Sequence, residues 1–578
     1  MVFLCIILSK SSLSRQNSFF SSLGKPALAD LKSGLTVGVV VIPQAMAYAT
    51  LAGLPPQHGL YAAFVPVLLY GLFGSSRYLS IGPAALDSML VAAFLVTLDL
   101  PSLSTYVQAA ILLTLLVGSL QFLLGLLKLG VLVQFLSKPV ISGFTMAAVF
   151  LIGVSQLAPF LGLKDLTSPF AALKSSFNVI VMTSSIGIGS LVLLLLGKRL
   201  LPKIPIELLV VILATLTTVS FKWAELGVAE VGSIPSGLPS FNGYLIDLYL
   251  IKELIPFAVA LAILGFLSSM TIVKASESKT GIVESNPNKE LRALGLANIV
   301  GAFFQSYLAS ASFSRSSILM GSGSKSRWAV LFSAALVGLS LFVLTPLLEH
   351  IPMAVLSAIV LFSLIQLLSF NYPIKLWKQA RAEFLVLLCT FVLTLFVGII
   401  QGLVLGILVS LIVWISRSVK PHYAVLGKIR NTHYYKNIER FSQDVDQDER
   451  LLLFRFDAPI FFANKDYFNQ MLMDEIDKKG ENLQEIVLIS RGISYLDSSS
   501  IELLHHILKR LRQRGLGFSV AGAIGPTRDA MRRSGLMERI GGHRFFSKTA
   551  DAVSFLNGEI DATEHSENIA TQTNKQKV

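Results

Sequence analysis

The stretch LSIGPAALDSML (residues 79–90) has a counterpart, LASASFSRSSILM (residues 308–320), in the second half of the chain. Both are rich in serine and alanine, and each carries one charged residue, Asp87 or Arg315, beside strongly apolar runs. The apolar segments that they begin, 84–97 and 314–321, are too short to cross a bilayer, because a spanning helix needs about 20 residues. Short, interrupted spans at matching positions of two halves predict an inverted repeat with a binding site between broken helices.

The composition is that of a membrane protein. Of the 578 residues, 53% are hydrophobic and 14% are charged, whereas soluble domains carry about 25% charged residues. Apolar runs recur between about 33 and 419, and charged residues become frequent beyond them. We therefore expect an all-α polytopic domain embedded in the lipid bilayer, followed by a soluble C-terminal domain.

Fourteen apolar segments are expected as spans, seven in each half. Those of the first half are 33–54, 59–73, 84–97, 106–127, 130–159, 179–196 and 206–221. Those of the second half are 254–273, 291–307, 314–321, 328–349, 353–370, 383–400 and 402–419. Because each half holds an odd number of spans, the halves enter the membrane in opposite directions, and both termini lie on the same side.

The distribution of charge indicates which side that is. The formal net charge is +13, and a basic balance is also typical of nucleic-acid-binding proteins. Here, however, Lys and Arg gather in short loops such as 198–203 and 274–292, whereas 224–250 contains neither. Since cytoplasmic loops are enriched in Lys and Arg, we expect a multi-pass protein of the cell (inner or plasma) membrane with cytoplasmic N- and C-termini, and no nucleic-acid partner.

The C-terminal part has the pattern of a small α/β domain. Strands are expected at RLLLFRF (450–456), EIVLIS (485–490) and GFSVAG (517–522), and helices at 464–476, 500–514 and 527–535. The expected organisation is an N-terminal segment (1–30), the membrane domain (31–420), a charged linker (421–449), the α/β domain (450–557) and a disordered tail (558–578).

Several stretches resemble the SulP family of anion transporters, which includes sulfate permeases and relatives of prestin and pendrin. In the membrane domain they are VGVVVIPQAMAYATLAGLPPQHGLYAAFVP (37–66), GSSRYLSIGPAALDSML (74–90), LSKPVISGFT (136–145), ESNPNKELRALGLANIVGAFF (284–304) and SFSRS (312–316). FRFDAPIFFAN (454–464) and ISYLDSSSIELL (493–504) resemble the family's STAS domain. The resemblance covers about 31–557.

The resemblance implies a seven-plus-seven inverted repeat like that of uracil permease, in which a core domain moves against a gate domain, and a homodimer. It also implies secondary transport of an inorganic anion by alternating access, with sulfate as the first candidate. Relatives with nearly the same motif carry bicarbonate, chloride, oxalate or C4-dicarboxylates, so the anion stays open, as do symport, exchange and an uncoupled, channel-like conductance. Nucleobase permeases share the architecture, but their sites use acidic residues to hold a neutral ring.

No enzymatic activity, cofactor or metal is expected. A membrane-embedded enzyme needs metal ligands, or a nucleophile and its base, together at helical depth. His58, His350 and His422 lie at span ends or in loops, and none has a partner motif.

The predicted binding site is built on the two short spans. Helix N-termini offer free N–H groups and a positive dipole end, which replace the water around an anion. The turn SFSRS places the hydroxyls of Ser312 and Ser314 and the cation of Arg315 at the second of these N-termini. The resemblance adds Gln44 and Tyr48 on the first span. The expected substrate-binding residues are Gln44, Tyr48, Pro83, Ala84, Ala85, Ser312, Phe313, Ser314 and Arg315.

Each of the larger side chains has a structural alternative. Arg315 could pair with a carboxylate and lock helices together, since a lone arginine inside a membrane costs about 2.5–3.5 kcal/mol or more. Gln44 could form a hydrogen bond between helices, and Tyr48 could be ordinary core.

Coupling to a cation is the open question. Many proton- or sodium-coupled bacterial relatives carry a carboxylate where this chain has Ser268. Either the protein is an uncoupled transporter or exchanger, or coupling to H+ or Na+ has moved to Asp87, since intramembrane acids are functional by default. The structural alternative for Asp87 is a partner of Arg315 or a charge at a helix N-terminus.

Ser498 is a candidate regulatory site. In free-standing STAS proteins of the anti-sigma-antagonist type, the serine that follows this aspartate is phosphorylated, and Ser498 occupies that place. The alternative is that Ser498 caps the helix that begins there.

Overall fold

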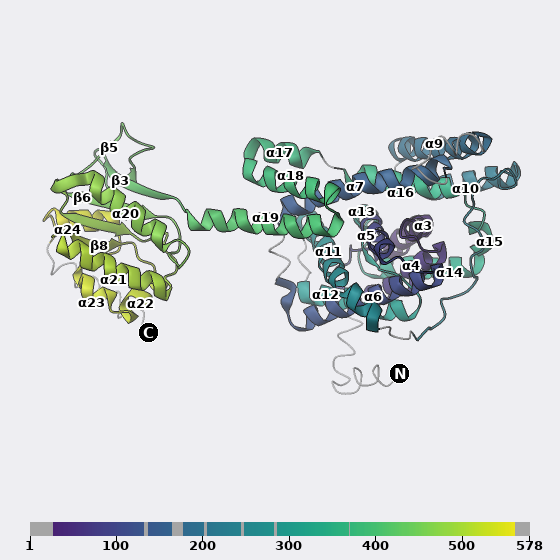
Figure 1. Cartoon of the computed structure of the whole chain (residues 1–578), viewed down its shortest axis with the longest axis horizontal. Helices are drawn as coiled ribbons and strands as arrows, with labels where there is room; N and C mark the ends of the chain where they lie inside the picture. Colours follow the sequence, from purple (N-terminus) through teal and green to yellow (C-terminus); the bar gives the residue numbers. More distant parts are fainter. Residues whose placement is uncertain are drawn as a thin grey trace. The chain divides into compact units, whose positions relative to one another are not determined.

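The structure, a computed structural model of the chain, describes residues 27–131, 137–163, 177–201, 205–243, 248–281, 286–368 and 370–560 (Figure 1). It divides into two compact units, Met1–Ser410 and Leu411–Val578. The first is helical and the second is α/β. Most of the expected N-terminal segment, and the expected disordered tail beyond 560, lie outside the described residues.

Each of the fourteen expected spans overlaps a helix. The first half contains α3 (Leu28–Leu51), α4 (Pro56–Phe73), α5 (Ala85–Leu95), α6 (Leu103–Leu126), α7 (Lys138–Leu161), α9 (Phe177–Leu200) and α10 (Ile206–Ser220). The second half contains α11 (Leu248–Thr280), α12 (Pro287–Phe303), α13 (Phe313–Gly321), α14 (Trp328–Val343), α16 (Met353–Leu367), α18 (Arg381–Phe396) and α19 (Ile399–Val419). Three short helices accompany them, namely η1 (Val96–Leu98), α15 (Thr345–Leu348) and α17 (Asn371–Gln379).

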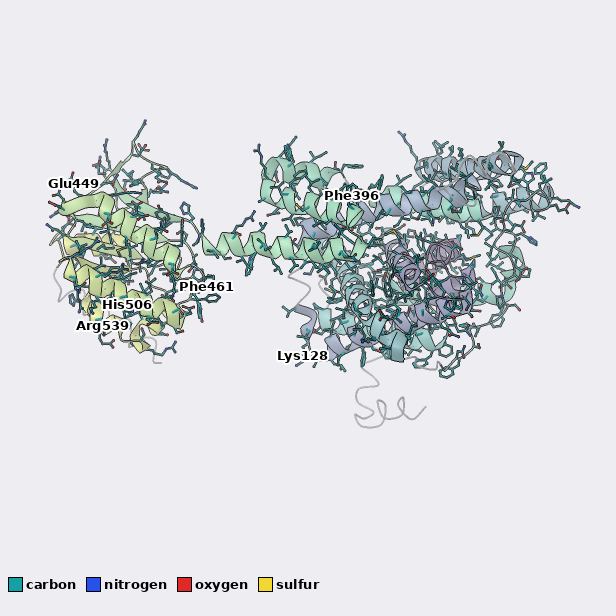
Figure 2. The ribbon with its side chains drawn as sticks, in the orientation of Figure 1. Lys128, Phe396, Glu449, Phe461, His506 and Arg539 are labelled. Atoms are coloured by element: carbon teal, nitrogen blue, oxygen red, sulfur yellow. The ribbon has the colours of Figure 1, made fainter. Side chains whose placement is uncertain are left out.

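The helices have the length and surface of membrane spans. Among the described residues, seven helices are long and apolar enough to cross a membrane, by length and composition alone. Their outward-facing side chains are often large and apolar. Phe396 at the end of α18 is an example, with 82% of its surface exposed (Figure 2). Such side chains suit contact with lipid rather than water.

The contacts between helices repeat when the two halves are exchanged. α6 packs against α12 as α14 packs against α4, α3 contacts α14 as α11 contacts α6, and α7 contacts α18 as α16 contacts α9. Two short strands, β1 (Ile81–Gly82) and β2 (Ser310–Ala311), pair antiparallel. Each strand precedes the short helix of its half, so the two halves meet there in opposite directions, as the odd number of spans predicts.

The helices form two groups. In the first, which we call the core domain, α3, α4, α6, α11, α12 and α14 pack together and carry the short helices α5 and α13. In the second, the gate domain, α7 contacts α16, α9 and α18, and α9 also contacts α16 and α10. Figure 1 shows α7 and α16 alongside one another, and α5 contacts both of them. This is the arrangement that the resemblance implies.

Glycines bring α6 and α12 of the core domain close together. A Cβ built on Gly295 would lie 2.4 Å from the backbone N of Phe122 and 2.6 Å from the carbonyl O of Gly118. Small residues at such points let helix backbones touch inside a membrane.

Gly295→Ala is therefore expected to lower the melting temperature of the purified protein by roughly 1–4 °C, because overpacking costs about 1–3 kcal/mol and the entropy of unfolding is large in a domain of this size. Gly153→Ala is the matched control, since a Cβ on this α7 glycine meets no described atom within 4 Å. Thermal unfolding of both variants in the same detergent makes the comparison. Equal melting temperatures would show that α6 and α12 do not need this close contact.

The C-terminal unit is built on one sheet. Its strands are β3 (Tyr423–Ile429), β4 (Tyr435–Asn437), β5 (Val445–Asp446), β6 (Leu451–Phe456), β7 (Glu485–Ile489), β8 (Gly517–Ala521) and β9 (Phe545–Phe546). The order is β4-β3-β6-β7-β8-β9, with β5 paired to β3. β6 to β9 are parallel, and β3 runs antiparallel to β6. The helices are α20 (Lys465–Lys479), α21 (Ser498–Gln513), α22 (Gly525–Arg533), α23 (Leu536–Ile540) and α24 (Thr549–Leu556), with 3-10 turns at Gly480–Asn482 and Gly542–Arg544.

The linker is shorter than the sequence predicts. Three strands, β3, β4 and β5, fall inside the segment 421–449 that was expected to connect the domains. β3 joins the sheet because its side chains alternate, with Val425 buried on one face and Leu426 on the other. The charged residues around this strand conceal the alternation in the sequence.

Candidate functional site

The two short helices begin at the pair of crossing strands. The N–H of Ser312, the residue before α13, donates to the carbonyl O of Ser80 at 3.0 Å. The N–H of Ser80 donates to the hydroxyl of Ser316 at 3.0 Å. These bonds, together with the β1–β2 pairing, hold the N-termini of α5 and α13 beside each other. The first N–H groups of both helices lack partners within their own helix, and so the crossing concentrates donors at one place.

Buried amides fix the second strand. The side chain of Asn298 accepts from the N–H of Ala309 at 2.9 Å and donates to its carbonyl O at 3.1 Å and to Oε1 of Gln121 at 3.3 Å. Sequence reasoning missed both amides. The signal was present, because a polar side chain inside an apolar span is expensive and usually has a specific partner.

Arg315 links the two short helices. It is fully buried, and its Nη1 donates to the carbonyl O of Pro83 at 2.8 Å. Gly82, at φ 139°, leaves room for the guanidinium, because a Cβ there would lie 3.2 Å from Nη2. Nε and Nη2 have no hydrogen-bond partner among the described residues. The cation therefore lies directly behind the N-terminus of α5, with donor capacity to spare.

A cavity of about 1010 Å³ opens between the core and gate domains beside these N-termini. From the core it is lined by eight of the residues singled out in the sequence, namely Tyr48, Ala84, Ala85, Asp87, Ser268, Ser312, Phe313 and Ser314. Gln44, Pro83 and Arg315 are not part of this lining. Arg315 thus lies behind the wall of the cavity, where a buried cation creates a positive potential.

Tyr48 joins the two domains at the cavity. Its hydroxyl, on α3 of the core domain, donates to Oγ of Ser363, on α16 of the gate domain, at 3.0 Å. Gln44 lies one turn earlier on α3 with 1% of its surface exposed, and its Oε1 finds no partner in the described ranges. Tyr48 therefore does more than fill the core, because its hydroxyl connects the core domain to the gate domain.

Asp87 belongs to the first turn of α5 and is 3% exposed. One carboxylate oxygen accepts the hydroxyl of Ser310, and the other has no hydrogen-bond partner in the described structure. Asp87 and Arg315, both of which are described, form no hydrogen bond with each other. The carboxyl faces the same cavity as Ser268.

The gate side of the cavity carries residues that sequence reasoning missed. Lys198 at the end of α9 and Glu207 at the start of α10 line it together with Ser363 and Gln366 of α16. In the sequence, Lys198 has the signal of a loop cation, and Glu207 has that of a charge at a span end. Only the tertiary contact between gate and core brings them to the site. Within the described ranges, no group of three or more His, Cys, Asp or Glu residues could hold a metal ion.

In the C-terminal unit, Asp497 rather than Ser498 caps α21. Asp497 Oδ1 accepts the N–H and the hydroxyl of Ser500, both at 2.8 Å. Burial raises the pKa of the Asp497 carboxyl, but the hydrogen bonds from Ser500 and Phe462 and the charge of Lys465 outweigh burial, and the pKa is lowered overall. Ser498 is exposed at the first helical position. The capping role suggested for Ser498 therefore belongs to its neighbour.

The chain is similar to known proteins over both of its parts. The sequence model of the sulfate permease family matches residues 28–390, and that of the STAS domain matches 442–552. The chain is 35% identical over 552 residues to a chloroplastic sulfate transporter of Arabidopsis thaliana (91% of this chain, 79% of the relative). It is 31% identical over 530 residues to a probable sulfate transporter of Mycobacterium tuberculosis (91% and 94%).

A solved structure has the same fold. The murine Solute Carrier 26 family member A9 anion transporter, in the inward-facing state, matches with a TM-score of 0.83 over 96% of this chain and 98% of that chain, at 24% identity. This likeness confirms the predicted fold class, a helical membrane domain of the inverted-repeat type followed by an α/β STAS domain.

Proposed function

The chain belongs to the sulfate permease family, and on that premise we propose that it is a secondary transporter that moves inorganic anions, sulfate first, by alternating access. The observation that carries the proposal is the cavity between core and gate, onto which the N-termini of α5 and α13 open. A protein that transfers an anion through a membrane must replace its hydration shell, and helix N-termini supply N–H groups already oriented for this task.

In the proposed site, the anion accepts hydrogen bonds from backbone N–H groups near Ala85 and Ser314 and from the hydroxyls of Ser312 and Ser314. Arg315 raises the potential from behind Pro83, and its fixed position adds no reorganisation when the anion arrives. The core then moves against the gate and exposes the anion to the other side. The Tyr48–Ser363 hydrogen bond marks the contact that must rearrange during this movement.

We propose that Asp87 is the coupling residue if a proton or sodium gradient drives uptake. It is a carboxyl on the cavity wall with one oxygen that lacks a partner in the described structure, and Ser268 cannot take up a cation's charge. The alternative is an anion exchanger without a coupling ion, which a serine rather than a carboxylate at position 268 favours.

Sulfate is proposed because the relatives at 35% and 31% identity are named as sulfate transporters. N–H groups and one cation recognise charge more than shape, and so bicarbonate and C4-dicarboxylates are the alternative substrates. Radiolabelled sulfate uptake into proteoliposomes, with bicarbonate, chloride and succinate as competitors, tests the proposal. Saturable sulfate uptake supports it. A competitor that is transported while sulfate is not would replace sulfate as the substrate.

We further propose that the protein is a homodimer in the cell membrane with both termini in the cytoplasm. Loops rich in Lys and Arg support this orientation, as does the absence of both residues from 224–250.

Labelling of a single cysteine placed at Ser236, which is exposed, tests the orientation. An impermeant thiol reagent added outside intact cells is expected to modify it, because 224–250 is proposed to be external. Labelling that requires lysed cells would invert the proposed topology. The control is a cysteine placed at Ser442, an exposed residue on the proposed cytoplasmic side.

A further inference from the structure

The gate side of the cavity presents a cation that the proposed site does not use. Lys198 lines the cavity, and its ammonium donates to Oε1 of Gln366 and lies 5.3 Å from the ring centre of Phe362. These partners are a neutral amide and an aromatic ring. Glu207 lines the same cavity and its carboxyl interacts electrostatically with the ammonium, but the two described side chains are not in direct ion-pair contact. The ammonium of Lys198 therefore makes no direct ion pair within the described cavity lining.

The neighbours of Lys198 place it close to the proposed binding site. Phe362, Ser363 and Gln366 occupy one face of α16, because residues three and four apart on a helix lie together. Ser363 accepts the hydrogen bond from Tyr48 of the core domain. The amide that holds Lys198 therefore lies one helical turn from the point where core and gate touch.

Resting on the proposed function, we propose that Lys198 binds the transported anion from the gate side, so that the anion is held between the two domains. The half-helix N–H groups contact it from the core, and the ammonium contacts it from the gate. Gln366 keeps the ammonium in place before the anion arrives, and a neutral amide gives up a cation to an anion at low cost, because hydrogen bonds to charged partners are the stronger ones.

Two carboxyls and two cations lie around the cavity. Asp87 of α5 and Glu207 of α10 are carboxyls on its wall, while Lys198 and the buried Arg315 are cations. Binding of a dianion such as sulfate depends on the two cations more strongly than binding of a monoanion does, because Coulomb energy scales with the product of the charges.

An anion held by both domains would also favour the arrangement in which the gate domain has closed on the core domain. An anion that contacts both core and gate binds the closed arrangement better than the open one, and a ligand shifts an equilibrium only by such a difference in affinity. Lys198 therefore links loading of the site to the approach of the gate.

The test compares Lys198→Gln with Arg199→Gln, which removes the adjacent cation that does not line the cavity, and with Lys198→Arg, which keeps the charge. Initial rates of sulfate uptake into proteoliposomes give KM and kcat, and inhibition of that uptake gives the Ki of chloride. For Lys198→Gln we expect the sulfate KM to rise roughly 10-fold and the chloride Ki to rise about 3-fold. Chloride carries half the charge of sulfate and so loses half the interaction energy with the ammonium, and half the energy corresponds to the square root of the fold-change in affinity. Arg199→Gln should match the wild type, and Lys198→Arg should restore most of the affinity.

The negative results of this test can be told apart. A wild type without anion uptake would refute the proposed function itself. Wild-type uptake together with an unchanged sulfate KM in Lys198→Gln would refute only the role of Lys198. A lower kcat with unchanged KM and Ki, or equal factors for both anions, would also refute it, because a purely structural lysine does not distinguish valence.

Discussion

Arg315→Ala is expected to reduce sulfate uptake by at least about 100-fold while the protein remains folded. The substitution removes the cation behind the N-terminus of α5 and leaves the carbonyl O of Pro83 without its partner. It also frees a fully buried volume at the junction of the two short helices. Both short helices therefore lose the charge that favours an anion and the bond that fixes their relative position.

The matched control is Arg292→Ala, which removes an exposed arginine of α12 that does not line the cavity. Uptake into proteoliposomes is measured for both variants, and size-exclusion chromatography shows whether each remains folded. A second variant, Arg315→Lys, keeps the charge and covers the case in which alanine disturbs folding. Wild-type rates in Arg315→Ala would remove Arg315 from the site.

Asp87→Asn is expected to abolish uptake driven by a proton gradient while exchange of anions persists. Asparagine has nearly the shape of aspartate and can still accept the hydroxyl of Ser310, but it cannot bind and release a proton. The short helix α5 therefore keeps its position, and only the coupling is lost.

The measurement is sulfate accumulation with and without an inward proton gradient, followed by sulfate exchange at equal pH. Asp99→Asn is the control, because Asp99 lies near the end of the same apolar segment and does not line the cavity. Its φ is 46°, a conformation that asparagine tolerates. Accumulation that survives in Asp87→Asn and still depends on the proton gradient would assign coupling to another group.

Hydrophobic patterning locates the spans well and their ends poorly. α11 extends from Leu248 to Thr280, well beyond the expected 254–273, because charged residues such as Lys252 and Glu277 continue the helix outside the apolar run. The helix α17 was missed, since NYPIKLWKQ is too short and too polar to register as a span. Apolarity reports where a helix contacts lipid or core, whereas helix ends depend on propensity and local contacts.

The candidate site, too, can be predicted from the sequence only in part. The interrupted stretches at 79–90 and 308–320 predict that two short helices meet, because the interruption is written into each stretch. The position of Arg315 behind Pro83, and the arrival of Lys198 and Glu207 from the gate domain, depend on contacts between distant segments. No local pattern in a single sequence encodes those contacts.

An anion is expected to bind where the N-termini of α5 and α13 open onto the cavity. Selenate has the charge and nearly the shape of sulfate and scatters anomalously at the selenium edge, so crystals of the full chain grown with selenate report its position directly. We expect an anomalous peak inside the cavity, within hydrogen-bond distance of backbone N–H groups at the starts of α5 and α13. A peak at another place in the membrane domain, with none beside these two helices, would contradict it.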